Sequence, residues 1–296
     1  MVSLVGCSSK SSAEKKPSPS VGQKPKAPAE LKSIATELDM LIAELDKKFK
    51  MQNMPAMQQN IQLNPQGKSQ GGQTPGGQTQ GAQSQGGQTQ GAQSQGAQSQ
   101  GGQSQSAPQG GQSQKQATDW QKEFSSLKTI HTNWNNLMPE AVQAGMSIDS
   151  RNQFSKALEQ LTQDISKQKL EDSLSAVLMV YKNYADLNQI FTSSVPAEFY
   201  QVKYETMTAI FESSRKNWTA AEEHAPKFKE HWVYFSAQAK DADPKILSRT
   251  EFAILDLEQA IKSKQMELVM IKGEIAMTNL KSLEEKLSSQ PSGQGQ

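Results

Sequence analysis

Residues 170–191 read LEDSLSAVLMVYKNYADLNQIF, and this stretch decides the fold class. Its large apolar side chains recur at spacings of three and four residues, which places them on one face of an α-helix. The residues on that face are Leu170, Leu174, Val177, Tyr181, Tyr184, Leu187 and Phe191. The same period recurs in six further segments between residues 117 and 288. We therefore predict an all-α domain over 117–288, either a helical bundle or a short array of helical hairpins.

Proline, glycine and a capping residue mark where these helices should begin and end. Pro139 and Gly145 are expected to end the first helix. Pro226 falls inside the fifth helix and is expected to kink it. The pair Asp243-Pro244 predicts the start of the sixth helix, as N-cap and first helical residue. The expected core includes Trp120, Phe124, Trp134, Ile148, Phe154, Trp218, Trp232, Ile254, Ile271, Ile275 and Leu280.

The domain contains an internal repeat. Residues 158–169 line up with residues 254–265 at an offset of 96, with three matched apolar residues followed by four polar ones. Trp134 and Trp232 lie upstream at an offset of 98. We predict that each half consists of a Trp-bearing helix and a tight helical hairpin, and that the helix around Tyr204 joins the halves. About 170 residues are enough to bury a core unaided.

The second half carries a recognisable pattern of residues. It contains NWTAA at 217–221, a second tryptophan at Trp232, Glu251, and LEQAI at 257–261, followed by a short hairpin. This pattern resembles an uncharacterised family of small helical proteins from Firmicutes. The resemblance implies a helical fold and a Gram-positive source, and it implies no reaction.

The only cysteine of the chain, Cys7, ends the tetrapeptide Leu4-Val5-Gly6-Cys7. A thiol is a nucleophile that can take a diacylglyceryl group as a thioether. Small residues before it let the backbone enter a peptidase cleft. The tetrapeptide resembles the bacterial lipobox, which implies lipid attachment at Cys7. We therefore expect a lipoprotein, anchored in the cell membrane and facing outward from a Gram-positive cell.

The residues before the lipobox do not make a signal peptide. Such a peptide needs a basic start and an apolar stretch of about 7–15 residues. Only six residues precede Cys7, and none of them is basic. We therefore expect the coding sequence to begin upstream of Met1. If translation begins at Met1, the alternative is a cytoplasmic protein.

Three segments lie between the lipobox and the helical domain. Residues 8–28, rich in Ser, Lys and Pro, are expected to form a disordered tether. Residues 29–50 predict an amphipathic helix whose apolar face needs a partner: the C-terminal domain, a second copy or the membrane. Its mixed polar face favours coiled-coil-like packing over membrane contact. Residues 51–116, with repeats of Gly-Gly/Ala-Gln-Ser/Thr-Gln, are expected to form a disordered spacer or to self-associate. A disordered tail is expected at 289–296.

Charge and composition exclude several classes of function. The 31 basic residues balance the 30 acidic ones, so the whole chain offers no electrostatic footprint for nucleic acid. The sequence contains no run of about 18 apolar residues that would predict a transmembrane helix. A loose basic patch could bind anionic wall polymers or only solvate the surface. Its residues are Lys227, Lys229, Lys240 and Lys245.

The chain has few residues suited to catalysis. No Gly-rich phosphate loop, HExxH, GxSxG or CxxC motif is present, so we predict no catalytic residues and no cofactor. His224 and His231 lie seven residues apart on one predicted helix. They permit a metal or haem site with Glu223 or Glu230, and surface positions are the alternative. The tryptophans and tyrosines could line a ligand cleft or form the core.

These observations predict a membrane-anchored, extracytoplasmic lipoprotein that acts as a non-enzymatic interaction or structural module. Its partners would be the membrane, through lipid on Cys7, and an unidentified protein that packs against the helices. In this prediction the 51–116 spacer holds the helical domain away from the bilayer. The alternative is a helical sensor or carrier that binds a small ligand or a metal.

Overall fold

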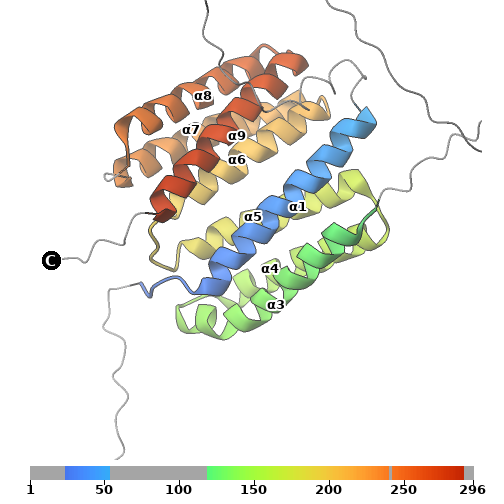
Figure 1. Ribbon diagram of the computed structural model, residues 1–296, viewed down its shortest axis with the longest axis vertical. Coiled ribbons are helices and arrows are strands. Elements are labelled where there is room, and N and C mark those ends of the chain that lie inside the picture. Colours follow the sequence, from blue (N-terminus) through green and yellow to red (C-terminus); the bar gives the residue numbers. More distant parts are fainter. Residues whose placement is uncertain (1–23, 54–118, 240–241, 290–296) are drawn as a thin grey trace, which may run out of the picture. The chain divides into compact units, whose positions relative to one another are not determined.

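The computed structural model describes residues 24–53, 119–239 and 242–289. In these residues the secondary structure consists of eight α-helices with no strand, which confirms the all-α prediction (Figure 1). The helices are α1 (Ala29–Asn53), α3 (Gln121–Gln143), α4 (Ile148–Ser166), α5 (Leu170–Asn188), α6 (Glu198–Ser214), α7 (Trp218–Gln238), α8 (Pro244–Lys262) and α9 (Met266–Ser289).

The eight helices form two four-helix bundles. In the first bundle, α1 and α4 each pack against both α3 and α5. In the second bundle, α6 and α8 each pack against both α7 and α9. The bundles meet along α5 and α6 (Figure 1). The rings of Phe49 in α1 and Phe211 in α6 lie edge to face, with their centroids 6.2 Å apart. The buried side chains of both bundles form one continuous apolar core.

The hairpins of the two bundles are equivalent. The turn between α4 and α5 places Gln168 at φ 54°, and the turn between α8 and α9 places Lys264 at the same φ. These residues are 96 apart, which is the offset of the sequence repeat. Each lies in the left-handed region, as is usual just after a helix ends. The predicted pair of tight hairpins is therefore present.

The repeat extends to a fourth helix, because α6 corresponds to α1. Asn133 in α3 donates a hydrogen bond to Ser33 in α1 at 2.8 Å, and His231 in α7 contacts Glu198 in α6 at 2.9 Å. The buried positions of the two helices match at an offset of 168. They are Leu31, Ile34, Leu38, Leu41 and Leu45 in α1 and Phe199, Val202, Thr206, Ala209 and Ser213 in α6. The helix predicted to join the halves, α6, is thus also a member of the second bundle. Residues 54–118 separate α1 from the rest of its bundle and so obscure this match in the sequence.

The amphipathic helix predicted at 29–50 belongs to the first bundle. Its partner is therefore the C-terminal domain. Its apolar face, which includes Leu31, Ile34 and Leu38, is buried in the common core. Helix α1 continues to Asn53, three residues beyond the predicted end.

Ion pairs fix the end of α1 to the start of α3. Lys122 pairs with Glu44 at 3.3 Å, and Lys48 pairs with the buried Glu123. The Lys48 ammonium also lies 4.4 Å from the ring centroid of Trp120. The two ends of the intervening segment are thus anchored in one bundle.

The contact between the end of α1 and the start of α3 corrects the role predicted for the low-complexity spacer. Most of the predicted spacer at 51–116 falls in residues 54–118, which lie outside the described residues. Because that segment leaves from α1 and returns at α3, it is an insertion within a single bundle. It does not connect an anchor to a separate domain. The prediction that it holds the domain away from the bilayer is wrong for this reason.

The end of the predicted tether is ordered. The Ala27 N–H donates to the Thr192 carbonyl at 2.9 Å, and the Thr192 N–H donates to the Pro25 carbonyl at 2.8 Å. Residues 24–28, predicted to be disordered, thus run parallel to the chain between α5 and α6. Pro25 fixes its own φ, and the extended segment satisfies backbone groups of the connection between α5 and α6. Residues 8–23 lie outside the described residues.

Helix ends follow the predicted signals with one exception. Asp243 accepts a hydrogen bond from the Lys245 N–H at 2.8 Å, with Pro244 at the first helical position. Gly145 follows α3 with φ +101°, as a helix-ending glycine should. Pro139, however, lies inside α3. Leu137 and Ala141, two residues to either side, are fully buried and hold this turn helical, so the prediction that Pro139 ends the helix is wrong.

Four residues expected in the core are exposed: Phe124, Ile148, Ile271 and Ile275. In α9 the buried face instead carries small residues, including Gly273 and Ala276. A Cβ at position 273 would lie 2.8 Å from the Cδ1 of Ile210, so α6 approaches the backbone of α9 closely. Close packing therefore selects the small residues for the interior and leaves the isoleucines outside.

Candidate functional site

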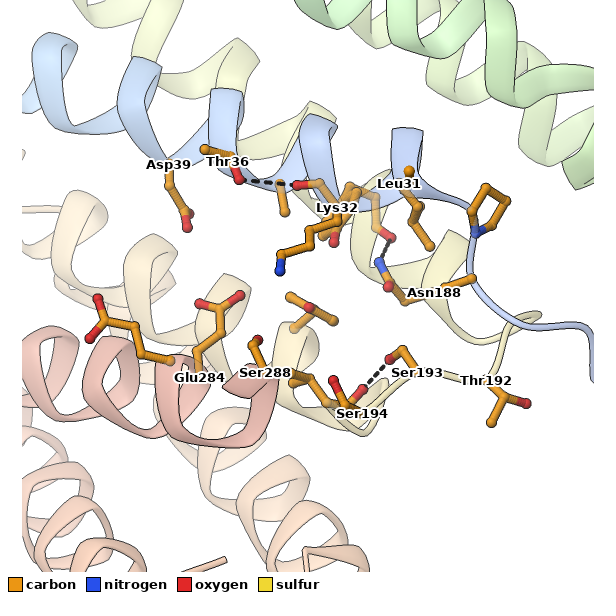
Figure 2. A pocket seen from close by; sticks show the side chains of 18 of the residues that line it. Leu31, Lys32, Thr36, Asp39, Asn188, Thr192, Ser193, Ser194, Glu284 and Ser288 are labelled. Carbon is orange, nitrogen blue, oxygen red and sulfur yellow. Dashed lines mark hydrogen bonds between the residues drawn. The ribbon is translucent and has the colours of Figure 1, made fainter. Parts of the chain in front are cut away.

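A cavity of about 710 Å³, open to solvent, lies between the two bundles (Figure 2). The first turns of α1 form one wall, and the last turns of α9 form the facing wall. The end of α5, the connection to α6 and the start of α6 complete the lining. The chain segment Lys26–Pro28 lies at its edge. Ligand sites in proteins commonly measure about 300–1,000 Å³, so this cavity has the size of a small-molecule site.

A buried ion-pair network lies at the floor of the cavity. The Lys203 ammonium, on α6, bonds the Asp39 carboxylate at 2.6 Å and the Glu284 carboxylate at 2.9 Å. The two carboxylates come from opposite walls, α1 and α9 (Figure 2). The Lys203 side chain is 5% exposed, Glu284 17% and Asp39 37%. One ammonium therefore faces two carboxylates, both of which line the cavity.

The network shifts the titration of its members. Burial lowers the pKa of Lys203, but the charges of Asp39 and Glu284 outweigh burial and leave that pKa above its usual value. Burial raises the pKa of Glu284, and the nearby Asp39 charge adds to the rise, so Lys203 offsets it only in part. Lys203 therefore stays charged, and Glu284 holds a proton more readily than an exposed glutamate does.

Tyrosine rings surround the network. Tyr184 and Tyr200 line the cavity with their rings edge to face, 5.2 Å apart. The Lys203 ammonium lies 5.7 Å from the ring centroid of Tyr181, whose buried hydroxyl has no hydrogen-bond partner among the described residues. Burial raises the pKa of all three phenols well above the usual 10, so they remain neutral.

The internal repeat shows that the fold does not require a charge at this place. At the offset of 168 that matches α1 with α6, Lys203 corresponds to Ala35, which is buried. An uncharged residue thus occupies this place in the first bundle. Burying a charge costs several kcal/mol unless it is well paired. A charged network at a position where the other bundle has an alanine, beside a cavity, identifies the best candidate for a functional site.

The histidines proposed for a metal site are held apart. The ring nitrogen Nδ1 of His224 contacts Glu205, and that of His231 contacts Glu198. Both glutamates come from α6, so Glu223 and Glu230 are not the partners. Among the described residues no group of three or more metal-ligating side chains comes together. The repeat matches His231 with Asn133, so its contact belongs to the packing between paired helices.

The aromatic residues divide between core and cavity. Trp120, Trp134 and Trp232 are buried, and Trp134 stacks on Phe154 with ring centroids 4.0 Å apart. These tryptophans are core residues, the interpretation that the sequence favours. The cavity is lined instead by tyrosines of α5 and α6.

The described lysines of the predicted basic patch and the third histidine, His131, do not line the cavity between the bundles. In the loose basic patch, Lys229 pairs with Glu258 at 3.6 Å, and Lys240 lies outside the described residues. His131 contacts Thr162 at 2.9 Å, and burial lowers its pKa.

The predicted lipid site lies in the part of the chain that the structure does not describe. Cys7 and the lipobox residues Leu4, Val5 and Gly6 all precede residue 24. Across the described segments, no helix has both the length and the apolarity needed to cross a membrane.

No family model matches the chain, and neither the curated proteins nor the solved structures compared with it include a similar one. The resemblance of residues 217–280 to a helical family stays a prediction. The Lys203 network was not predicted from the sequence. Its local signal was weak, because Lys203 lies in a segment, Phe199–Met207, that mixes aromatic and apolar residues with Gln201, Glu205 and Thr206.

Proposed function

We propose that this protein is a lipid-anchored, extracytoplasmic and non-enzymatic binding module whose recognition site is the cavity between the bundles. The observation that supports this proposal most strongly is the buried Lys203 network at the cavity floor, at a position where the first bundle has the uncharged Ala35. Of the two functions predicted from the sequence, ligand binding is the one for which the described residues provide a cavity.

The anchor would hold the domain close to the membrane. Sixteen residues separate Cys7 from Lys24, where the described chain begins. At about 3.3–3.6 Å per residue, they span at most about 60 Å. Residues 25–27 bind the connection between α5 and α6, beside the cavity. In this proposal the cavity lies near the membrane-attached end of the domain, and residues 54–118 form a side insertion.

The anchor has a direct test. The gene is expressed with its upstream region, and cells are labelled with a palmitate analogue. We expect label on the wild-type protein and none on Cys7→Ser, which should leave the membrane fraction. Label and membrane association that persist in Cys7→Ser would contradict lipid attachment at Cys7.

Binding in the cavity is tested by blocking it. Thr36 is exposed on α1, lines the cavity and bonds the carbonyl of Lys32 at 3.1 Å. Thr132 is its matched control, since it is exposed on α3 and bonds the carbonyl of Lys128 at 3.0 Å. A metabolite library is screened by thermal shift against the full chain carrying Cys7→Ser, alone or with Thr36→Trp or Thr132→Trp.

We expect compounds that raise the melting temperature of the parent and the Thr132→Trp variant but not that of Thr36→Trp. A screen in which no compound shows this pattern would contradict a ligand-binding cavity. The anchor experiment does not depend on this result.

A further inference from the structure

The charges around the cavity are separated by depth, and this separation indicates a class of ligand. At the floor, Asp39 and Glu284 share the single ammonium of Lys203, which leaves one excess negative charge. The low exposure of Lys203 and Glu284 reduces solvent screening there, so this excess acts strongly on a bound group.

The mouth of the cavity carries the opposite sign. Three exposed lysines line it, Lys26 from the entering chain, Lys32 from α1 and Lys281 from α9, against the single carboxylate of Glu285. Figure 2 shows the Lys32 amine reaching from α1 across the cavity toward the α9 wall. The surroundings therefore change from net negative at the floor to net positive at the mouth.

The wall between these ends is partly aromatic and partly apolar. Tyr184 and Tyr200 face the cavity beside Leu31 and Ala35. Neutral tyrosine rings attract ammonium groups through their faces. The tyrosines and the two carboxylates thus make the deep end suited to an organic cation.

We propose that the cavity binds a small zwitterion, with its ammonium between Asp39 and Glu284 and its carboxylate or phosphate at Lys32. This inference rests on the proposed function and names its ligand class. The net negative floor would repel a simple anion, and the net positive mouth would repel a simple cation. A zwitterion satisfies both ends and fits within about 710 Å³.

Two sources can supply this chemistry: free amino acids or peptides, and the headgroup of an aminophospholipid. Each source has a probe and a matched compound without the ammonium. Alanyl-alanine is compared with N-acetyl-alanyl-alanine, and glycerophosphoethanolamine with glycerol phosphate. Binding to the full chain carrying Cys7→Ser is measured by calorimetry at low and moderate salt.

We expect at least one ammonium-bearing probe to bind at least about ten times more tightly than its matched compound. The matched compound lacks the ammonium and so cannot form the charge-assisted bonds to Asp39 and Glu284. Asp39→Asn should lower the affinity for that probe by about tenfold, and Thr36→Trp should abolish its binding. Thr132→Trp should leave it unchanged. Which probe binds better identifies the source.

Equal affinity for a probe and its matched compound would overturn the inference, as would binding of neither probe. Circular dichroism of Asp39→Asn checks that it remains helical, and Thr36→Trp provides a result independent of the network. If the library yields ligands of another class that Thr36→Trp excludes, the zwitterion inference fails while the binding function stands. If Thr36→Trp excludes no compound at all, both fail.

Discussion

Lys203 joins the two bundles through a buried ion-pair network. Lys203 belongs to the second bundle. It bonds Asp39 on α1, in the first bundle, and Glu284 on α9, in its own bundle. The equivalent residue of the first bundle, Ala35, is uncharged and buried. Packing at this position therefore does not need the ion-pair network, which instead fixes which helices contact one another.

Removing the ammonium alone should destabilise the protein. Lys203→Met leaves two carboxylates together in a buried site, so we expect the free energy of unfolding to fall by about 3–5 kcal/mol at neutral pH. Adding Glu284→Gln removes one of those charges and should recover part of the loss. Urea denaturation measures both variants. A double variant no more stable than Lys203→Met would contradict this account of the network.

The buried tyrosines predict a loss of stability at alkaline pH. The pKa values of Tyr181, Tyr184 and Tyr200 are raised in the folded state, whereas the unfolded chain titrates near 10. The unfolded state thus loses protons first, so stability is complete below about pH 10 and falls above it. Each tyrosine contributes up to about 1.4 kcal/mol per pH unit.

This prediction is measured by denaturation at several pH values with tyrosinate absorbance as a second signal. Tyr184→Phe should make the fall in stability less steep by one proton. Tyr234→Phe is the control, because Tyr234 is 55% exposed. Ionisation of Tyr181, Tyr184 and Tyr200 near pH 10 in a chain that stays fully helical would refute the prediction.

At the scale of elements, α1 is far from its bundle in sequence and central to it in structure. Six of its apolar or small residues are buried in the common core. They are Leu31, Ile34, Ala35, Leu38, Leu41 and Leu45. The equivalent connection in the second bundle, between α6 and α7, needs only three residues, 215–217. The fold therefore does not require the long insertion between α1 and α3.

Replacing residues 54–118 with about 12 Gly/Ser residues, which span roughly 20 Å, should preserve the fold. Because a shorter loop costs less entropy to close, we expect a gain of about 1–2 kcal/mol in the free energy of unfolding. Urea denaturation and helical circular dichroism measure the result. A truncation that removes α1 instead exposes the core and should abolish cooperative unfolding. Loss of helical signal in the short-loop variant would contradict the packing of α1.

At the scale of the whole molecule, the shared core predicts that both bundles unfold together. Leu158 and Ile254 occupy equivalent positions, and each is about 1% exposed. Leu158→Ala and Ile254→Ala should each cost about 2–5 kcal/mol. Variants that retain only Trp134 or only Trp232 report on one bundle each. Both reporters should show the same transition, and two separate midpoints would show that the bundles unfold independently.

The amino-acid sequence by itself determined most of the local structure. Apolar spacing of three and four residues predicted the helices, because that spacing matches the helical turn. The Asp243-Pro244 start and the 96-residue repeat also held. Each of these depends on residues close together in the chain or on direct similarity of two segments. The exceptions, Pro139 inside α3 and the exposed Ile271, arose where packing between helices outweighed a local preference.

Only the tertiary structure decided which faces meet and what lies between them. Periodicity shows that α1 has an apolar face, but it does not identify the helix that covers it. The floor of the cavity joins Lys203 to residues 164 and 81 positions away. No local pattern links such residues, because an ion pair depends on distance in space and on burial. The lipid site at Cys7 remains a prediction from the sequence, and the cavity is known from the structure alone.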